Sequence, residues 1–106
     1  MSVTFHPCVL IPCYNHGAMM ANVLSRLAPF DLPCLVVDDG SEESTRLELE
    51  RLAAEQPQIT LIRLAENAGK GAAVIRGLAD STRARYSYAV QVDADGLHVI
   101  EYIARL

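Results

Sequence analysis

Four short apolar runs recur along this chain, and this recurrence restricts the folds that it can adopt. They are residues 8–11, 34–37, 59–64 and 88–92. Each run is continuous and partly β-branched, which is typical of strands buried on both faces. Strands of this kind occur in parallel sheets, whose faces are both covered by other elements.

The segments between the runs have apolar residues at helical spacing. The expected helices cover residues 19–27, 43–56 and 71–79, and a last helix is expected over residues 99–106. Alternation of strand and helix predicts an α/β fold, with right-handed crossovers and helices on both faces of a doubly wound parallel sheet. We expect the strand order 3-2-1-4, in which the side of the sheet to which successive strands are added switches between the first and the fourth strand.

Size and charge restrict the classes of function. A chain of 106 residues corresponds to one domain, with 51% hydrophobic and 21% charged residues. A net charge of −4 provides no basic surface, so nucleic acid is not expected as a partner. No apolar run is long enough to span a membrane and no signal peptide opens the chain, so we expect a cytoplasmic protein.

The three cysteines favour a reducing compartment. Cys8 and Cys34 lie within apolar runs and are interpreted as small buried core residues. A zinc site made by Cys8, Cys13, His6 and His16 is the alternative. It is disfavoured because no second close pair of ligands follows at a known spacing.

Polar residues follow the first two strands at their carboxyl ends. Tyr14, after the first strand, could stack on a nucleobase or pack over the first helix, and the residues alone leave both open. Asp38 and Asp39 end the second strand and would point to opposite sides, so that one faces a ligand while the scaffold holds the other. Alternatively, this stretch only starts a helix, with Ser41 or Ser44 as the N-cap.

Lys70 lies where the third helix is expected to begin, close behind Gly69. A lysine opposes the helix dipole at an N-terminus, so a bound anion would explain its position, with backbone N–H groups and the ammonium both donating. A solvated surface lysine is the alternative. The stretch is not a Walker A loop, since Gly71 occupies the place of the required Ser or Thr.

Asp93 and Asp95 follow the fourth strand, one residue apart. In an extended segment their carboxylates point to the same side, where they suit a hard divalent cation, Mg²⁺ or Mn²⁺. The alternative is a loop in which Asp95 caps the next helix. With the order 3-2-1-4, all these residues meet in one crevice, which suits a nucleoside diphosphate with a divalent ion.

Four ordered motifs resemble those of a known enzyme family. They are residues 9–15 (VLIPCYN), 36–41 (VVDDGS), 67–73 (NAGKGAA) and 93–98 (DADGLH). Together they resemble family 2 glycosyltransferases of the GT-A fold, and within them the dolichol-phosphate-mannose or polyprenyl-phosphate sugar synthases. The resemblance implies the N-terminal part of that Rossmann-like fold.

The resemblance also implies a site and a reaction. By it, Pro12, Tyr14 and Asp39 hold the nucleoside, and Lys70 lies near the nucleotide. Asp93 and Asp95 bind the metal and the diphosphate. The implied reaction transfers a sugar from a nucleotide-diphosphate sugar to an acceptor, either a lipid phosphate or a saccharide. The metal would stabilise the leaving diphosphate.

The sequence departs from the family pattern in several places. His16 replaces the usual Glu, Leu97 replaces a common Gln, and Val99 and Ile100 lie where a proline-containing stretch is common. The family's catalytic domain also continues further, so residues 1–106 are expected to be its nucleotide-sugar-binding half, with the catalytic base beyond Leu106.

The short length has further implications. The 106-residue chain alone is expected to be inactive, and a longer protein could associate with membranes. The edge of the fourth strand is expected to be free and to favour self-association. Two alternatives stay open: a non-catalytic nucleotide-sugar binding module or inactive fragment, and a response-regulator-like domain, which would leave the motif of residues 67–73 without a role.

Overall fold

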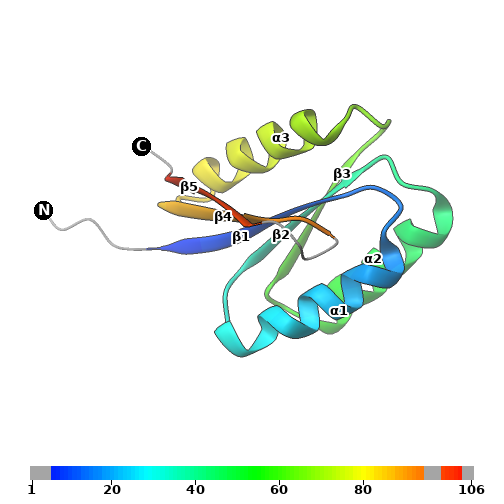
Figure 1. The fold of residues 1–106 in the computed structure, drawn as a ribbon, viewed down its shortest axis with the longest axis horizontal. Coiled ribbons are helices and arrows are strands. Elements are labelled where there is room, and N and C mark those ends of the chain that lie inside the picture. Colours follow the sequence, from blue (N-terminus) through cyan, green and yellow to red (C-terminus); the bar gives the residue numbers. More distant parts are fainter. Residues whose placement is uncertain (1–5, 95–98, 104–106) are drawn as a thin grey trace, which may run out of the picture.

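The computed structural model describes residues 6–94 and 99–103. Strands and helices alternate along the chain as the apolar runs predict (Figure 1). The elements are β1 (Pro7–Cys13), α1 (Gly17–Leu27), the 3₁₀ helix η1 (Ala28–Phe30), β2 (Cys34–Asp39), α2 (Glu43–Glu55), β3 (Ile59–Leu64), α3 (Lys70–Arg83), β4 (Tyr88–Val92) and β5 (Val99–Ile103).

The strands form one sheet in the order β3-β2-β1-β4-β5. The first four strands are parallel to one another, so the predicted order 3-2-1-4 is confirmed. β1 lies between β2 and β4, with Val9 opposite Cys34 on one side and Val90 on the other. The carboxyl ends of β1, β2 and β4 therefore meet at one edge of the sheet.

The end of the chain differs from the sequence prediction. Residues 99–106 were expected to form a helix, but Val99–Ile103 is the strand β5, which pairs antiparallel with β4. Its sequence is rich in β-branched and aromatic residues, which favour a strand where a neighbouring edge offers free backbone groups. The prediction that the β4 edge is free is therefore wrong, and with it the reason for expecting self-association there.

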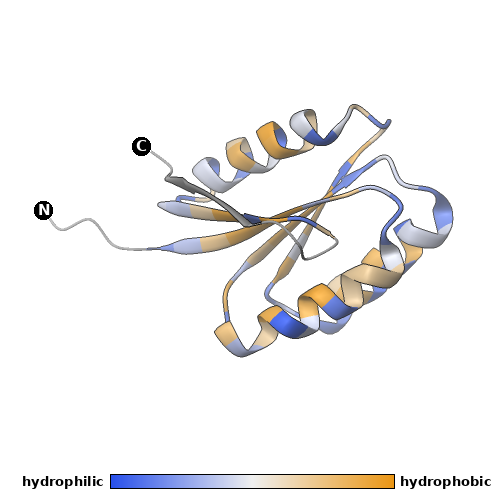
Figure 2. Ribbon diagram, viewed as in Figure 1, coloured by the Kyte–Doolittle hydropathy of each residue, from blue (hydrophilic) through white to orange (hydrophobic). Residues whose placement is uncertain are grey.

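Helices cover both faces of the sheet, as predicted. α1 and α2 lie on one face and α3 on the other (Figure 1). Side chains alternate along β1: Val9 and Ile11 pack with the α1 and α2 core, whereas Cys8 and Leu10 pack with the α3 core. Figure 2 shows hydrophobic segments along the central strands and at intervals along the helices.

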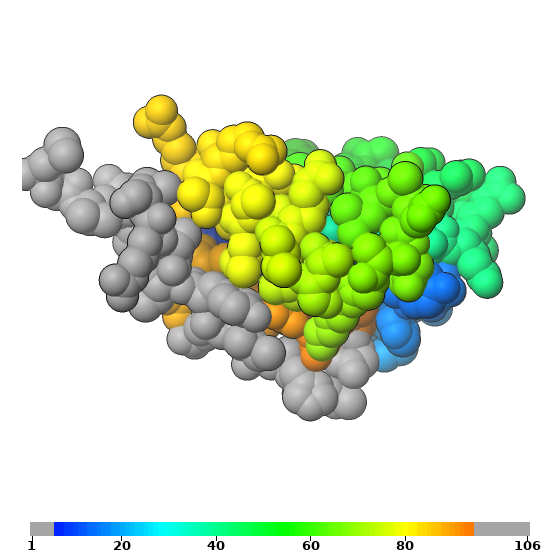
Figure 3. Space-filling view, turned by 90° about the horizontal axis from the view of Figure 1, so that it is seen from above, coloured from blue at the N-terminus to red at the C-terminus, as the bar shows by residue number. Residues whose placement is uncertain are grey.

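α3 lies directly against the sheet. Seen from the α3 side, its side chains cover much of that face, with β4 visible beside it (Figure 3). The helix begins immediately after Gly69, whose φ of 97° is open to glycine and strained for other residues. None of the helices in the described ranges is both long and apolar enough to cross a membrane.

Candidate functional site

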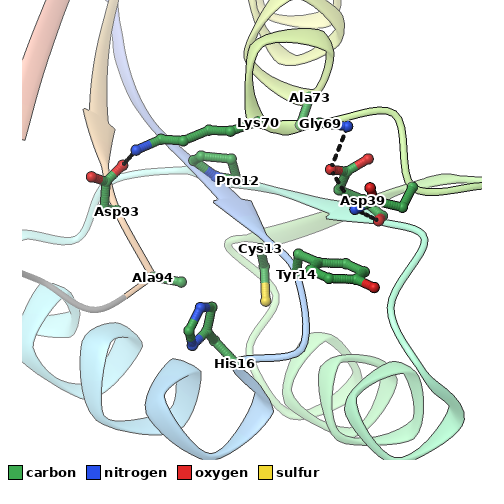
Figure 4. A pocket seen from close by; sticks show the side chains of 11 residues that line it. Pro12, Cys13, Tyr14, His16, Asp39, Gly69, Lys70, Ala73, Asp93 and Ala94 are labelled. Atoms are coloured by element: carbon green, nitrogen blue, oxygen red, sulfur yellow. Dashed lines mark hydrogen bonds and ion pairs between the residues drawn. The ribbon is translucent and has the colours of Figure 1, made fainter.

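A pocket of about 280 Å³ lies where β1, β2 and β4 end and α3 begins (Figure 4). It is lined by Pro12, Cys13, Tyr14, His16, Asp39, Asn67, Gly69, Lys70, Ala73, Asp93 and Ala94. Five of the six predicted site residues are among them. The sixth, Asp95, lies outside the described residues. The predicted convergence of the motif loops at one sheet edge is therefore confirmed for the residues that the structure describes.

Asp39 is a buried carboxylate at the end of β2, with 2% of its surface exposed. Its Oδ1 accepts the backbone N–H of Ala68 at 2.8 Å, and its Oδ2 accepts that of Gly69 at 3.0 Å. The Asn67 side chain donates to the same Oδ2 at 3.1 Å. Asp39 thus satisfies backbone donors beside the N-terminus of α3 and holds the loop that leads into this helix.

Asp38 lies on the opposite side of β2 from Asp39, where protein groups surround it. It is fully buried, accepts the backbone N–H of Ser41 at 3.0 Å, and lies 3.3 Å from Nε of Arg63. The Nη1 atom of Arg63 also reaches Glu50 at 3.1 Å. The scaffold therefore holds Asp38, as expected for one of the two carboxylates, but it holds Asp39 as well, and only Asp39 also lines the pocket.

The loop after β1 is joined to the loop after β2 by a reciprocal pair of hydrogen bonds. The N–H of Asn15 donates to Oγ of Ser41 at 3.0 Å, and the N–H of Glu42 donates to Oδ1 of Asn15 at 2.8 Å. Asn15 has a φ of 54°, in agreement with the predicted turn. Neither Ser41 nor Ser44 is the N-cap of α2; Glu42 is, without a side-chain cap. Because Asn15 directly follows Tyr14, these two hydrogen bonds also fix the backbone next to Tyr14.

Tyr14 presents a substantial surface to solvent beside the pocket. Its residue is 45% exposed, and the ring lies at the pocket wall near Cys13 (Figure 4). This exposed surface is accessible to a planar ligand, and the stacking of Tyr14 on a nucleobase stays a prediction.

Asp93 lies across the pocket from Asp39 and is paired with a cation from α3. Nζ of Lys70 lies 2.7 Å from Oδ1 of Asp93 (Figure 4). The buried amide of Gln91 donates to the same oxygen at 3.0 Å. Sequence reasoning missed Gln91, because it treated the residue as part of an apolar run. The available signal was its position two residues before Asp93, on the same side of an extended segment.

The donor chemistry of this pocket fits a divalent cation in part. Asp93 supplies a carboxylate oxygen, the ligand type that Mg²⁺ and Mn²⁺ prefer. In this structure that oxygen is paired with the ammonium group of Lys70. Among the residues that the structure describes, no three His, Cys, Asp or Glu side chains gather to hold a metal. A metal here would depend on Asp95, which lies outside the described ranges, and on substrate phosphates.

All three cysteines are free and buried. Burial raises the pKa of Cys13 to about 11, and the charge of Asp38 adds to this effect while a backbone hydrogen bond at His16 opposes it. Burial likewise raises the pKa of Cys8 and of Cys34 to about 11. Without a metal, all three thiols are therefore neutral at pH 7, and within the described ranges no three His, Cys, Asp or Glu side chains are close enough together to hold a metal ion.

Comparison with known proteins identifies the family. The family model for glycosyl transferase family 2 matches residues 8–106. Polyprenol monophosphomannose synthase from Mycolicibacterium smegmatis is 36% identical over 101 residues, which cover 92% of this chain and 38% of that protein. Undecaprenyl-phosphate mannosyltransferase from Micrococcus luteus is 34% identical over 99 residues, covering 92% of this chain and 41% of that protein.

A solved structure has the same fold. The mannosyltransferase PcManGT from Pyrobaculum calidifontis, in complex with GDP-Man and Mn²⁺, aligns with a TM-score of 0.68 and 26% sequence identity. The alignment covers 85% of this chain and 27% of that one, and it confirms the expected Rossmann-like GT-A architecture. The chain spans about two fifths of the length of the two curated relatives. On its family match and its fold, this chain belongs to glycosyl transferase family 2.

Proposed function

We propose that residues 1–106 form the donor-binding half of a glycosyltransferase that takes its sugar from a nucleotide-diphosphate sugar. The observation that carries this proposal is the pocket itself, in which an exposed aromatic ring, two carboxylates and an ammonium converge. Loops from four separate parts of a family 2 chain contribute these groups.

The nucleoside is assigned to the side of the pocket formed by Pro12, Tyr14 and Asp39. The exposed ring of Tyr14 would stack on the base. A carboxylate has about four lone-pair positions, and three N–H donors already bond to Asp39. Asp39 can therefore accept one further donor from the base while it holds the loop in front of α3.

The diphosphate is assigned to the opposite side, with a divalent metal on Asp93 and Asp95. The neighbour PcManGT contains GDP-Man and Mn²⁺, which supports a nucleotide sugar with Mg²⁺ or Mn²⁺ as the cofactor. When bound, the metal would neutralise charge on the leaving diphosphate. Pro12 and Tyr14 would orient the nucleoside, and Lys70 would supply positive charge at the phosphates.

The acceptor is proposed to be a lipid phosphate. The two curated relatives are named for polyprenol and undecaprenyl phosphate chemistry. The base that activates the acceptor is assigned to chain beyond Leu106, and an association with membranes would follow from such an acceptor. The second candidate is a module that binds nucleotide sugars without transfer, which the pocket would serve equally well. Turnover measured on a protein that continues beyond Leu106 separates the two.

Calorimetry with a panel of nucleoside diphosphates, with and without Mn²⁺ or Mg²⁺, tests the binding proposal. Asp95→Ala should remove most of the metal-dependent part of the affinity. Asp39→Ala should weaken binding with or without metal, because its proposed partner is the base. A loss of about 1.4 kcal/mol would correspond to tenfold weaker binding. Asp80→Ala is the matched control, since Asp80 forms ion pairs with Arg76 and Arg83 on α3, does not line the pocket and should leave the affinity unchanged.

Two results would contradict these assignments. If the Asp95 and Asp39 variants bound nucleotide like the parent chain, the site would lie elsewhere. If the 106-residue chain alone transferred sugar at a rate typical of such enzymes, the assignment of the catalytic base to chain beyond Leu106 would be wrong.

A further inference from the structure

Lys70 occupies an unusual position for a lysine. It is the first residue of α3, where the helix dipole repels positive charge. Its side chain reaches across the mouth of the pocket toward β4 and ends 2.7 Å from Oδ1 of Asp93 (Figure 4). The attraction of the carboxylate therefore offsets the dipole, and the ammonium lies where a cationic ligand of Asp93 would also have to bind.

The two partners differ in how easily they can move. The side chain of Lys70 is 58% exposed and belongs to a flexible four-carbon chain, so it can leave at little cost in packing. The side chain of Asp93 is 12% exposed and is also held by the buried Gln91 amide. The carboxylate is thus the fixed partner of the pair and the ammonium is the mobile one.

We propose that Lys70 is a built-in counter-ion of Asp93 that a divalent cation must displace, and that the displaced ammonium then pairs with a phosphate of the nucleotide. This inference rests on the proposed function. The Gln91 amide is neutral and can keep its hydrogen bond to Asp93 during the exchange, whereas two cations next to one carboxylate oxygen repel each other.

The exchange couples the binding of metal to that of nucleotide. Metal alone must separate Lys70 from Asp93 and leaves the ammonium without that partner. A diphosphate provides a new partner for the ammonium, so each ligand raises the affinity for the other. Metal should therefore bind weakly to the nucleotide-free chain and much more tightly when a nucleoside diphosphate is present.

The affinity for Mn²⁺ without nucleotide is the direct readout. Lys70→Met removes the competing ammonium and keeps a side chain of similar length. It should bind Mn²⁺ about two- to fivefold more tightly than the parent chain in calorimetry, as expected for the loss of a partly exposed ion pair. The same variant should bind a nucleoside diphosphate more weakly in the presence of Mn²⁺, so the coupling between the two ligands should shrink.

Arg76→Met is the matched control. Arg76 lies six residues further along α3, pairs with Asp80, and loses the same single charge on substitution. Comparison with Arg76→Met separates the specific effect of Lys70 from the general effect of net charge on Mn²⁺ binding. Lys70→Arg is the second variant: it keeps a cation next to Asp93, so its Mn²⁺ affinity should stay near that of the parent chain.

The results distinguish failure of this inference from failure of the proposed function. If Lys70→Met binds Mn²⁺ no more tightly than Arg76→Met, the exchange is wrong, and the donor-site proposal still depends on the Asp39 and Asp95 variants. If the parent chain and all variants bind neither Mn²⁺ nor a nucleoside diphosphate, both proposals are wrong.

Discussion

Gly40 follows β2 directly and lies close against the loop before α3. Its φ is 67°, in the left-handed region. A Cβ added there would lie 2.3 Å from the backbone N of Asn67 and 2.5 Å from the backbone C of Glu66. This close approach allows the neighbouring Asp39 carboxylate to reach the N–H groups of Ala68 and Gly69.

We expect Gly40→Ala to destabilise the fold strongly. The left-handed backbone costs about 1–2 kcal/mol for an L-residue, and the clash is with backbone atoms that cannot rotate away. The loss should be about 2 kcal/mol or more in urea unfolding. Gly71→Ala is the control: a Cβ there meets nothing within 4 Å, and alanine is the better helix former, by up to about 1 kcal/mol. Equal effects of the two substitutions would contradict this account.

α3 and β1 are packed in direct contact at the scale of whole elements. Gly77 faces Leu10 in β1, and a Cβ at Gly77 would lie 2.1 Å from Cδ1 of that side chain. Leu10 is fully buried, so it has little room to move aside. The absence of a side chain at Gly77, in the middle of α3, lets the helix approach the sheet closely at this point.

A double-mutant cycle tests this packing. Gly77→Ala alone should destabilise the chain by about 1–3 kcal/mol through overpacking, and Leu10→Ala alone by about 2–5 kcal/mol through a cavity. The double variant should lose clearly less than the sum, because the smaller side chain in β1 makes room for the new methyl group. Chemical denaturation of all four proteins gives the coupling, and additive losses would mean that the two residues do not limit the approach of α3.

β5 forms one edge of the sheet and covers β4. It pairs along the full length of β4, from Val99 opposite Val92 to Ile103 opposite Tyr88. The backbone groups of β4 are therefore paired on both sides, by β1 and by β5. An edge that was expected to be free, and to invite pairing with another copy, is covered by the same chain.

A chain that ends at His98 lacks β5 and tests whether this strand stabilises the fold and shields the edge of β4. We expect a lower unfolding midpoint and concentration-dependent association in size-exclusion chromatography with light scattering, because the β4 edge would be left open. A chain that ends at Ile103 keeps β5 and is the control, which should behave like the parent. If both shortened chains were equally stable and monomeric, β5 would contribute neither stability nor protection.

Local sequence determined much of the fold and of the candidate site. The apolar runs predicted four parallel strands and their order, and the polar residues behind them predicted which loops form the pocket. These predictions succeed because burial on both faces leaves a pattern within a few residues, and because parallel strands end at one edge. The same local pattern failed for residues 99–103, where a short apolar segment fits a helix or a strand equally well.

Only the tertiary structure decided how the polar side chains are used. Asn15 and Ser41 are 26 residues apart, and Asp39 and Gly69 are 30 apart, yet both pairs are hydrogen bonded. Lys70 meets Asp93 across the pocket in the same way. A carboxylate looks alike in sequence whether it faces a ligand, a backbone N–H or an ammonium. Its partner is decided by which buried polar groups the packed helices and strands bring within hydrogen-bond distance, since burial without a partner is costly.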